Sequence, residues 1–210
     1  RCQPVTGVQT CALPICRRYP GRGYGGHFKL WLSSGAPRPY NSFGNGAAMR
    51  VSAAGFLAES LEEARALARS SAGVTHNHPE GIKGAVATAE GIFLARGGAS
   101  LAEIRSALSA YYDLDFTLDA IRPDYAFDVT CQGTVPQAIV ALLESEGFED
   151  AVRNAISIGG DSDTLAAITG SLAEGFYGVP DPIRQHALSI LDDGLRSLAL
   201  TFPEPRKPRP

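Results

Sequence analysis

The sequence has little of three things that would each point to a particular class of protein: excess charge, long apolar runs and evenly spread cysteine. Its 19 Lys and Arg residues nearly balance 22 Asp and Glu residues, for a formal net charge of -3. Nucleic-acid binding depends on clustered cations that release counterions from phosphates, so this balance argues against a nucleic-acid partner. No segment approaches the roughly 20 consecutive apolar residues that cross a bilayer. We therefore expect a cytoplasmic protein with no membrane partner.

Cysteine is scarce outside the first sixteen residues. Three of the four cysteines fall within residues 1–16, and only Cys131 lies in the rest of the chain. The run from Val5 to Ile15 resembles the conceptual translation of a common sequencing-adapter oligonucleotide, so we interpret residues 1–16 as an artefact; a natural disordered leader is the alternative. On this interpretation the cysteines predict no disulfide framework, and the natural protein begins well upstream, which makes the chain a fragment.

The rest of the composition is that of one globular domain. The chain has 210 residues, of which 44% are hydrophobic and 20% charged, and a domain of this size buries a working core. We assign residues 17–200 to that domain. The tail at 201–210 carries four prolines and several basic residues, which predicts an extended, solvated end.

Helical signals dominate the domain. Two serine–glutamate pairs, Ser60 with Glu63 and Ser100 with Glu103, have the spacing of a capping box. Apolar residues recur at helical intervals after both pairs and in most of the later chain. We expect helices near 28–32, 57–70, 82–93, 101–112, 135–145, 148–157, 164–177 and 182–197. Alternation of period two appears only around 114–118, so the predicted fold class is all-α.

The run from Gly159 to Thr164 contains two carboxylates and a hydroxyl before a predicted helix. On a regular helix Asp161 and Asp163 would point roughly 200° apart, but the two preceding glycines permit an irregular backbone that brings them together. With Thr164 they would form a cluster of hard oxygen ligands of the kind that holds Mg²⁺ or Mn²⁺. The alternative is a turn in which one aspartate only caps the helix.

A glycine-rich motif lies much earlier in the chain, at Asn41-Ser42-Phe43-Gly44-Asn45-Gly46-Ala47-Ala48-Met49-Arg50. A loop of this kind that opens a helix exposes backbone N–H groups, which bind phosphate without lysine. Phe43 could stack on a base or a ribose face. The alternative is a plain loop in which Asn45 or Ser42 caps the helix.

The third motif is Thr75-His76-Asn77-His78-Pro79-Glu80, before another predicted helix. A His-x-His pair with Cys131 could bind zinc, but no paired cysteine spacing supports that interpretation. We prefer the hypothesis that one histidine donates a hydrogen bond to a ligand while the other caps or packs. An ordinary loop remains open.

In their order and spacing, the three motifs together resemble the ADP-ribosylglycohydrolase family, which includes the glycohydrolase that reactivates dinitrogenase reductase. The resemblance covers about residues 17–200 and implies an orthogonal helical bundle. It implies a metal-dependent hydrolase that cleaves the glycosidic bond of ADP-ribosylated proteins or of related ADP-ribose conjugates. The implied metal ligands are Asp161, Asp163 and Thr164, for a two-ion Mg²⁺ or Mn²⁺ centre. The implied contacts to ADP-ribose come from Ser42, Phe43, Gly44, Asn45 and Gly46, with His76 at the bound ribose.

The sequence also departs from the family pattern. Family members carry an upstream Thr-Asp-Asp-Thr-like run and an acidic residue that complete the metal shell, and the chain contains neither. The paired Asp192 and Asp193 lie within the predicted helix at 182–197 and lack flanking threonines. We therefore expect a bundle without its N-terminal helices, a catalytic acid outside this chain, and impaired activity. The alternative is a catalytically silent ADP-ribose-binding or structural protein of the same fold. The leaving group, whether arginine, serine, a thymidine base or an acetylated ribose, and the oligomeric state have no sequence signal.

Overall fold

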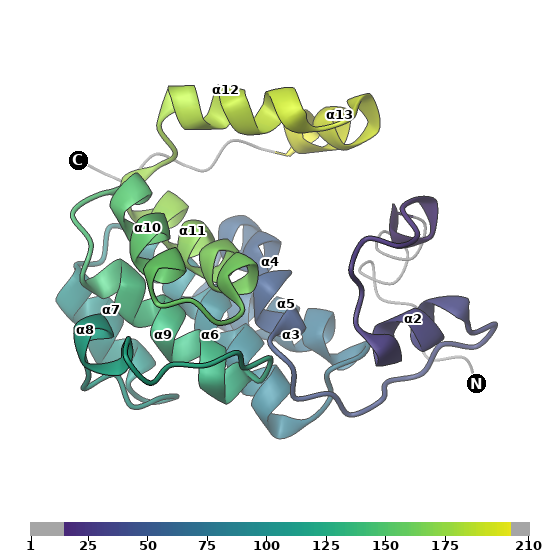
Figure 1. Ribbon diagram of the computed structural model, residues 1–210, viewed down its shortest axis with the longest axis horizontal. Coiled ribbons are helices and arrows are strands. Elements are labelled where there is room, and N and C mark those ends of the chain that lie inside the picture. Colours follow the sequence, from purple (N-terminus) through teal and green to yellow (C-terminus); the bar gives the residue numbers. More distant parts are fainter. Residues whose placement is uncertain (1–14, 203–210) are drawn as a thin grey trace.

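The computed structural model describes residues 15–202, and within that range the secondary structure is helical (Figure 1). The only strand-like pairing in the described part is an isolated antiparallel bridge between Gly44 and Thr130. The all-α prediction is therefore confirmed. The expectations for residues 1–14 and 203–210 lie outside the described residues. The helices are α2 (Gly26–Ser33), α3 (Gly46–Met49), α4 (Ser52–Leu57), α5 (Leu61–Gly73), α6 (Pro79–Arg96), α7 (Leu101–Leu108), α8 (Leu118–Ile121), α9 (Cys131–Leu143), α10 (Phe148–Ser157), α11 (Ser162–Tyr177), α12 (Asp181–Ile190) and α13 (Asp193–Thr201).

Helix α6 lies at the centre of the bundle and packs against α3, α4, α5, α7, α9 and α11. Small residues on several of its faces let the neighbours approach closely. A Cβ placed on Gly84 would lie 2.5 Å from Cys131 Sγ, and one on Gly91 would lie 2.7 Å from Leu172 Cδ2. Since real Cβ contacts are never that short, glycine at these positions sets how near α9 and α11 come to α6.

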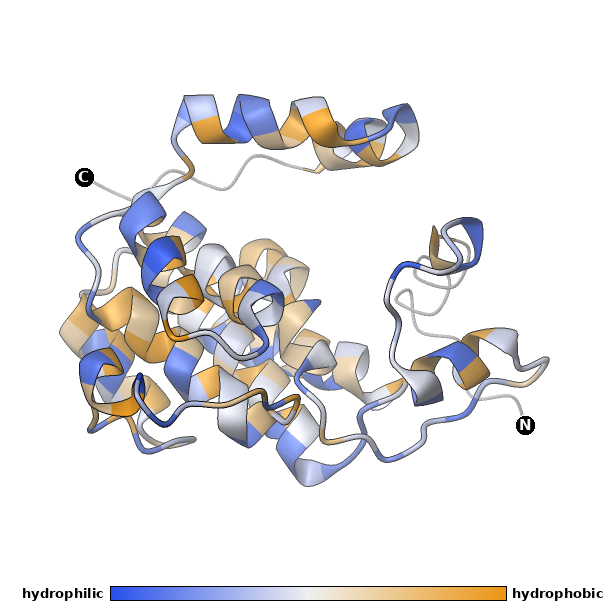
Figure 2. Cartoon of the chain, in the orientation of Figure 1, coloured by the Kyte–Doolittle hydropathy of each residue, from blue (hydrophilic) through white to orange (hydrophobic). Residues whose placement is uncertain are grey.

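The two ends of the chain differ from this body. Helices α12 and α13 stand apart from the rest of the bundle (Figure 1) and contain no buried residue. Both helices alternate apolar and polar faces (Figure 2), and Ile190 is 72% exposed. None of the described helices has the length and the apolar composition needed to cross a membrane.

The capping signals place helix starts accurately, and the apolar periodicity does so less well. Ser60 accepts a hydrogen bond from the Glu63 amide, so α5 begins at Leu61 and not at 57. The complete capping box of Ser100 and Glu103 opens α7, which ends earlier than expected, at Leu108. The helix predicted at 148–157 coincides with α10.

One predicted helix is wrong: the segment 182–197 forms two helices. Leu191 has extended backbone, and Asp192 then caps α13 by accepting hydrogen bonds from the amides of Gly194 and Leu195. Asp192 therefore lies at a helix start and not inside a helix. The periodicity continues across the break because both helices are amphipathic, which hides the boundary.

Candidate functional site

The glycine-rich loop, residues 41–46, is held on one side by the segment that precedes α6. The Ser42 amide donates to the Thr75 carbonyl at 3.4 Å, and the Asn41 amide donates to Asn77 Oδ1 at 2.7 Å. Asn41 has a φ of 55°, in the left-handed region that asparagine tolerates better than most residues. The second and third sequence motifs are therefore adjacent in the fold.

On its other side, the loop pairs with the start of α9. The Asn45 amide donates to the Val129 carbonyl at 2.8 Å, and the Cys131 amide donates to the Phe43 carbonyl at 3.0 Å. The Cys131 thiol also donates to the Gly44 carbonyl at 3.2 Å. These bonds, together with one from the Gly44 amide to Ser42 Oγ at 3.1 Å, occupy the amides of Ser42, Gly44 and Asn45 and hold the loop between two helix starts. These three N–H groups are therefore not the free phosphate donors that the sequence predicted.

The Asn45 side chain connects this loop to the acidic motif, 116 residues further along the chain. Its Nδ2 donates to Asp161 Oδ2 at 2.6 Å and to Thr134 Oγ1 at 3.0 Å. Asn45 is only 7% exposed, so this link is a buried and directional contact. All three sequence motifs therefore meet at one place, beside the starts of α3, α9 and α11.

Asp161 occupies the N-cap position of α11 but makes no capping hydrogen bond. The backbone before it turns through Gly159 and Gly160, whose φ values are 77° and 67°. A Cβ on Gly160 would lie 2.5 Å from the Tyr125 ring, so that ring fits only because the residue is glycine. The interpretation of Asp161 as a simple helix cap is therefore not what the structure shows.

Asp161, Asp163 and Thr164 differ in exposure and in partners. Asp161 is partly buried, Asp163 is exposed and Thr164 is buried. Burial raises the pKa of Asp161, the hydrogen bond from Asn45 opposes that rise, and the neighbouring Asp163 carboxylate adds to it. The Thr164 amide donates to Asp163 Oδ1 at 3.0 Å. Negative charge is thus concentrated where a cation would relieve it.

These donors match the chemistry of a hard divalent cation but do not make a complete set. Carboxylate and hydroxyl oxygens are the ligands that Mg²⁺ and Mn²⁺ prefer. Among residues 15–202, however, no group of three or more His, Cys, Asp or Glu side chains lies close enough to hold a metal ion. The described residues offer two carboxylates and one threonine hydroxyl here, which alone would not fill the coordination shell of either ion.

The zinc interpretation finds no support in this part of the chain. His78 Nδ1 accepts a hydrogen bond from the Glu80 amide at 3.1 Å and so caps α6. Cys131 is buried, and burial raises its thiol pKa to about 12, which disfavours the thiolate that binds metal. One histidine of the motif is thus a cap, in agreement with the sequence-based hypothesis.

His76, the other histidine, is buried against the glycine-rich loop. A Cβ placed on Gly44 or Gly46 would lie 3.5 or 3.4 Å from His76 Nε2. Its Nδ1 lies 2.7 Å from Thr75 Oγ1. Burial, reinforced by the nearby Arg50 charge, lowers the pKa of His76 to about 4. The ring is therefore neutral at pH 7 and has one nitrogen directed at the loop.

Two exposed aromatic side chains lie on the glycine-rich loop and in the segment just before α9. Phe43 is 48% exposed and makes an edge contact with His78, with ring centroids 5.5 Å apart. Phe127 is 70% exposed and precedes Val129, which holds Asn45. Exposed rings beside a polar loop offer stacking surfaces.

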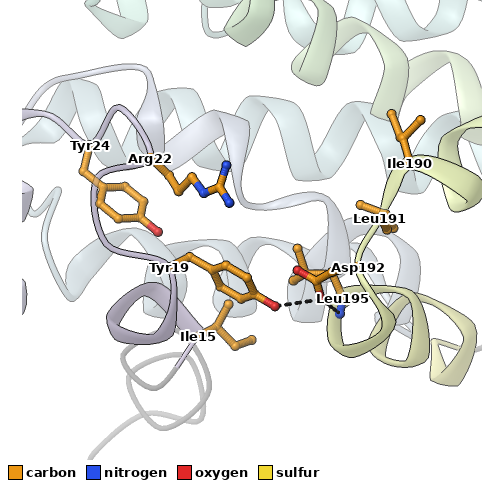
Figure 3. A pocket seen from close by; sticks show the side chains of 8 residues that line it. All are labelled: Ile15, Tyr19, Arg22, Tyr24, Ile190, Leu191, Asp192 and Leu195. Atoms are coloured by element: carbon orange, nitrogen blue, oxygen red, sulfur yellow. Dashed lines mark hydrogen bonds between the residues drawn. The ribbon is translucent and has the colours of Figure 1, made fainter.

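A pocket of about 460 Å³ lies elsewhere, between the N-terminal segment and the α12–α13 pair (Figure 3). Tyr19 donates a hydrogen bond across it to Asp192 Oδ1 at 2.9 Å. Ile190 and Leu195 contribute apolar walls. None of the residues that sequence reasoning assigned to a site lines this pocket, so it is distinct from the place where the three motifs meet.

Comparison with known proteins gives a consistent result. The model of the family described as ADP-ribosylglycohydrolase matches residues 9–208. ADP-ribosylhydrolase ARH3 of Homo sapiens is 25% identical over 185 residues, which cover 66% of this chain and 51% of that protein. ARH3 of Bos taurus is 24% identical, covering 78% of this chain and 61% of that protein. The chain thus spans about half the length of the human relative.

A solved structure described as an ADP-ribosylglycohydrolase-related protein complex shares the fold. It has a TM-score of 0.63 and 24% sequence identity, and the match covers 90% of this chain and 70% of that one. The likeness confirms the predicted helical architecture.

Proposed function

The chain belongs to the ADP-ribosylglycohydrolase family, and we propose that it acts on the glycosidic bond between ADP-ribose and a protein side chain or a related leaving group. The observation that carries the proposal is the hydrogen bond from Asn45 to Asp161. It joins the glycine-rich loop to a pair of carboxylates suited to a cation. Neither feature alone would indicate this chemistry, and a site for an ADP-ribose conjugate needs both.

In this proposal the loop from Ser42 to Gly46 binds the diphosphate and the neighbouring ribose of ADP-ribose. The backbone of this loop is fixed on both sides by hydrogen bonds, so binding requires little ordering. Phe43 offers an exposed face for stacking on a base or sugar. His76 lies beside the two glycines and contacts the ribose.

We propose that Asp161, Asp163 and Thr164 contribute ligands to a Mg²⁺ or Mn²⁺ site. When bound, such an ion would orient ribose hydroxyls and polarise a water molecule as positive charge develops on the sugar. Asn45 holds Oδ2 of Asp161 by donating a hydrogen bond to it. Thr134, fully buried in α9, fixes the Asn45 amide in turn.

We also propose that turnover by these 210 residues is weak. Affinity for hard cations rises with the number of charged ligands, and the described residues bring together only two carboxylates. Departure of the leaving group also requires a proton donor, which we place outside the described part of the chain. The same observations favour a second candidate function, a protein of this fold that binds ADP-ribose without hydrolysing it.

Calorimetric titration of the 210-residue chain with ADP-ribose, with and without Mg²⁺ or Mn²⁺, tests the proposal. We expect binding that tightens when either ion is added. An affinity that is the same with and without the ions would support the loop as the ADP-ribose site and would contradict the assignment of Asp161, Asp163 and Thr164 as metal ligands. A folded sample that does not bind ADP-ribose at all would reject the proposed site.

A hydrolysis assay separates the two candidate functions. Peptides carrying ADP-ribose on arginine or on serine, incubated with stoichiometric chain and Mg²⁺, would release ADP-ribose slowly if the chain is an enzyme. Binding without release of any leaving group over many hours would favour the non-catalytic alternative.

A further inference from the structure

Arg50 and Thr75 form a buried hydrogen-bond chain that ends on His76. Arg50 Nη2 donates to Thr75 Oγ1 at 2.7 Å and also to the Ser71 carbonyl at 2.9 Å. Thr75 Oγ1 in turn lies 2.7 Å from His76 Nδ1. Thr75 is completely buried, so water does not compete for these contacts. The sequence motifs indicate no role for either the Arg50 or the Thr75 side chain.

The direction of each hydrogen bond follows from the chemistry of the donors. A guanidinium only donates, so Thr75 Oγ1 is the acceptor of the bond from Arg50. The single Thr75 hydroxyl proton is then free to point at His76 Nδ1. An oxygen that already accepts from a cation is a weaker acceptor for a second N–H group, which disfavours a proton on Nδ1.

We propose that Arg50 and Thr75 are positioning residues that hold His76 in its neutral Nε2–H tautomer, with this N–H directed as a hydrogen-bond donor toward a ligand in the glycine-rich loop. The geometry on the loop side agrees, because Nε2 is the ring atom closest to the positions where a Cβ would lie on Gly44 and Gly46. A ribose or phosphate oxygen in the loop would accept this bond. That part of the inference rests on the proposed function, whereas the tautomer does not.

Tyr40 is the competing partner for the Thr75 hydroxyl. Its ring lies beside His76, with centroids 6.0 Å apart. Burial raises the pKa of Tyr40, and Arg50 and the Thr75 hydroxyl partly offset that rise. If the Thr75 proton went to Tyr40, Nδ1 of His76 would have to carry its own proton. A Tyr40→Phe variant removes this competitor and should leave the tautomer of His76 unchanged.

The test is a two-bond ¹H–¹⁵N correlation spectrum of the full 210-residue chain labelled with ¹⁵N-histidine, at pH 7. The chain has four histidines, and a His76→Asn variant identifies the His76 signals by their loss. His78 is an internal reference, because its Nδ1 accepts from the Glu80 amide and its neutral form must carry the proton on Nε2. We expect the same Nε2–H pattern for His76.

Two variants at Thr75 separate positioning from packing. Thr75→Ser keeps the hydroxyl and should keep the single tautomer, whereas Thr75→Val keeps the shape and should give a mixture. Arg50→Met should mix the tautomers as well, because it frees the Thr75 hydroxyl to rotate. We expect Thr75→Val to weaken ADP-ribose binding about fivefold, the value of one modest hydrogen bond, and Thr75→Ser to restore it.

The outcomes distinguish this inference from the proposed function. A proton on Nδ1 in the unmodified chain, or a single tautomer that persists in Thr75→Val, would overturn the inference. The Nε2–H tautomer in a chain that fails to bind ADP-ribose would overturn the proposed function and keep the hydrogen-bond chain. Tight binding by Thr75→Val despite mixed tautomers would overturn the role of His76 as a donor.

Discussion

Helices α11 and α13 both begin with an aspartate at the N-cap position, and the two aspartates do different things. Asp192, before α13, accepts hydrogen bonds from the amides of Gly194 and Leu195 at 2.9 and 3.0 Å. Asp161, before α11, makes no such capping bond to its helix and instead accepts a hydrogen bond from the Asn45 side chain. Asp192 caps its own helix and also accepts from Tyr19, whereas Asp161 belongs to a site where three sequence motifs meet.

The two carboxylates also differ in their proton affinity. The Leu195 amide and the Tyr19 hydroxyl hold the pKa of Asp192 below its ordinary value. Burial raises the pKa of Asp161 above that value. An aspartate that could cap a helix but does not gives up stabilisation that a cap would supply. The contrast teaches that such a residue is a stronger functional candidate than its spacing alone suggests.

The largest effect that we expect comes from removing the exposed carboxylate of the acidic motif. In any form of the chain that turns over substrate, Asp163→Ala should lower turnover by at least about a hundredfold, because a metal ligand is lost. The matched control is Asp193→Ala on α13, whose exposed carboxylate pairs with Arg196. Rates of ADP-ribose release measure both. Activity of Asp163→Ala within about tenfold of the unmodified chain would contradict the metal role.

Gly159 and Gly160 form the turn before Asp161, and alanine at these two positions should destabilise the fold to different extents. Gly160→Ala should lower the free energy of unfolding by about 3 kcal/mol, since it adds strain at positive φ to a collision with Tyr125. Gly159 also has positive φ but nothing lies within 4 Å of its Cβ position, so Gly159→Ala should cost only about 1 kcal/mol. Denaturant unfolding measures the free energy of unfolding of both variants. Equal decreases would show that the Tyr125 ring does not restrict position 160.

Burial of His76 should also make the stability of the chain depend on pH. His76 has a folded pKa of about 4, below the ordinary 6.5, so the folded state favours the neutral ring. Stability from this source is therefore present above pH 6.5 and is lost as the pH falls toward 4. Between pH 7 and pH 5 the unmodified chain should lose about 2 kcal/mol more than a His76→Asn variant. The matched variant His186→Asn, at an exposed position on α12, should lose as much stability between pH 7 and pH 5 as the unmodified chain. The same loss in His76→Asn would refute the lowered pKa of His76.

The smallest effect that we expect comes from Asn45, whose side chain links the glycine-rich loop to Asp161. Asn45→Ala should weaken ADP-ribose binding by about 1–2 kcal/mol, because it removes a polar contact and releases Asp161. Asp192→Ala is the control, since it removes the other N-cap carboxylate far from the loop and should leave the dissociation constant unchanged. Calorimetry at fixed Mg²⁺ measures both affinities, and an unchanged value for Asn45→Ala would remove this residue from the site.

Local signals in the sequence predict the local parts of this fold. The serine–glutamate pairs locate the starts of α5 and α7 because a capping box is complete within four residues. The three motifs stand out in the sequence because their residue types carry chemistry. The family resemblance adds their expected proximity, which the contact of Asn45 with Asp161 agrees with.

The residues that support the site have no such signal. Thr134 lies in a mostly apolar helix, Tyr125 lies in a segment without a motif, and Arg50 ends the glycine-rich motif without a role assigned to it, yet each contacts a motif residue or its turn. Their roles depend on which helices pack together, and periodicity does not record that. The break at Leu191 escapes prediction for a related reason, since two consecutive amphipathic helices look like one when only their apolar residues are counted.

The glycines of α6 limit how the glycine-rich loop can change during evolution. A Cβ on Gly81 would lie 2.6 Å from the Ser42 carbonyl, and one on Gly84 would meet Cys131, which holds the loop from its other side. A substitution on this face of α6 therefore requires the loop backbone to move, so helix and loop can change only together. The exposed side chain of Phe43, on the loop itself, has no such constraint. Relatives with different ligand preferences can diverge at exposed positions of this kind while α6 and the loop backbone remain the same.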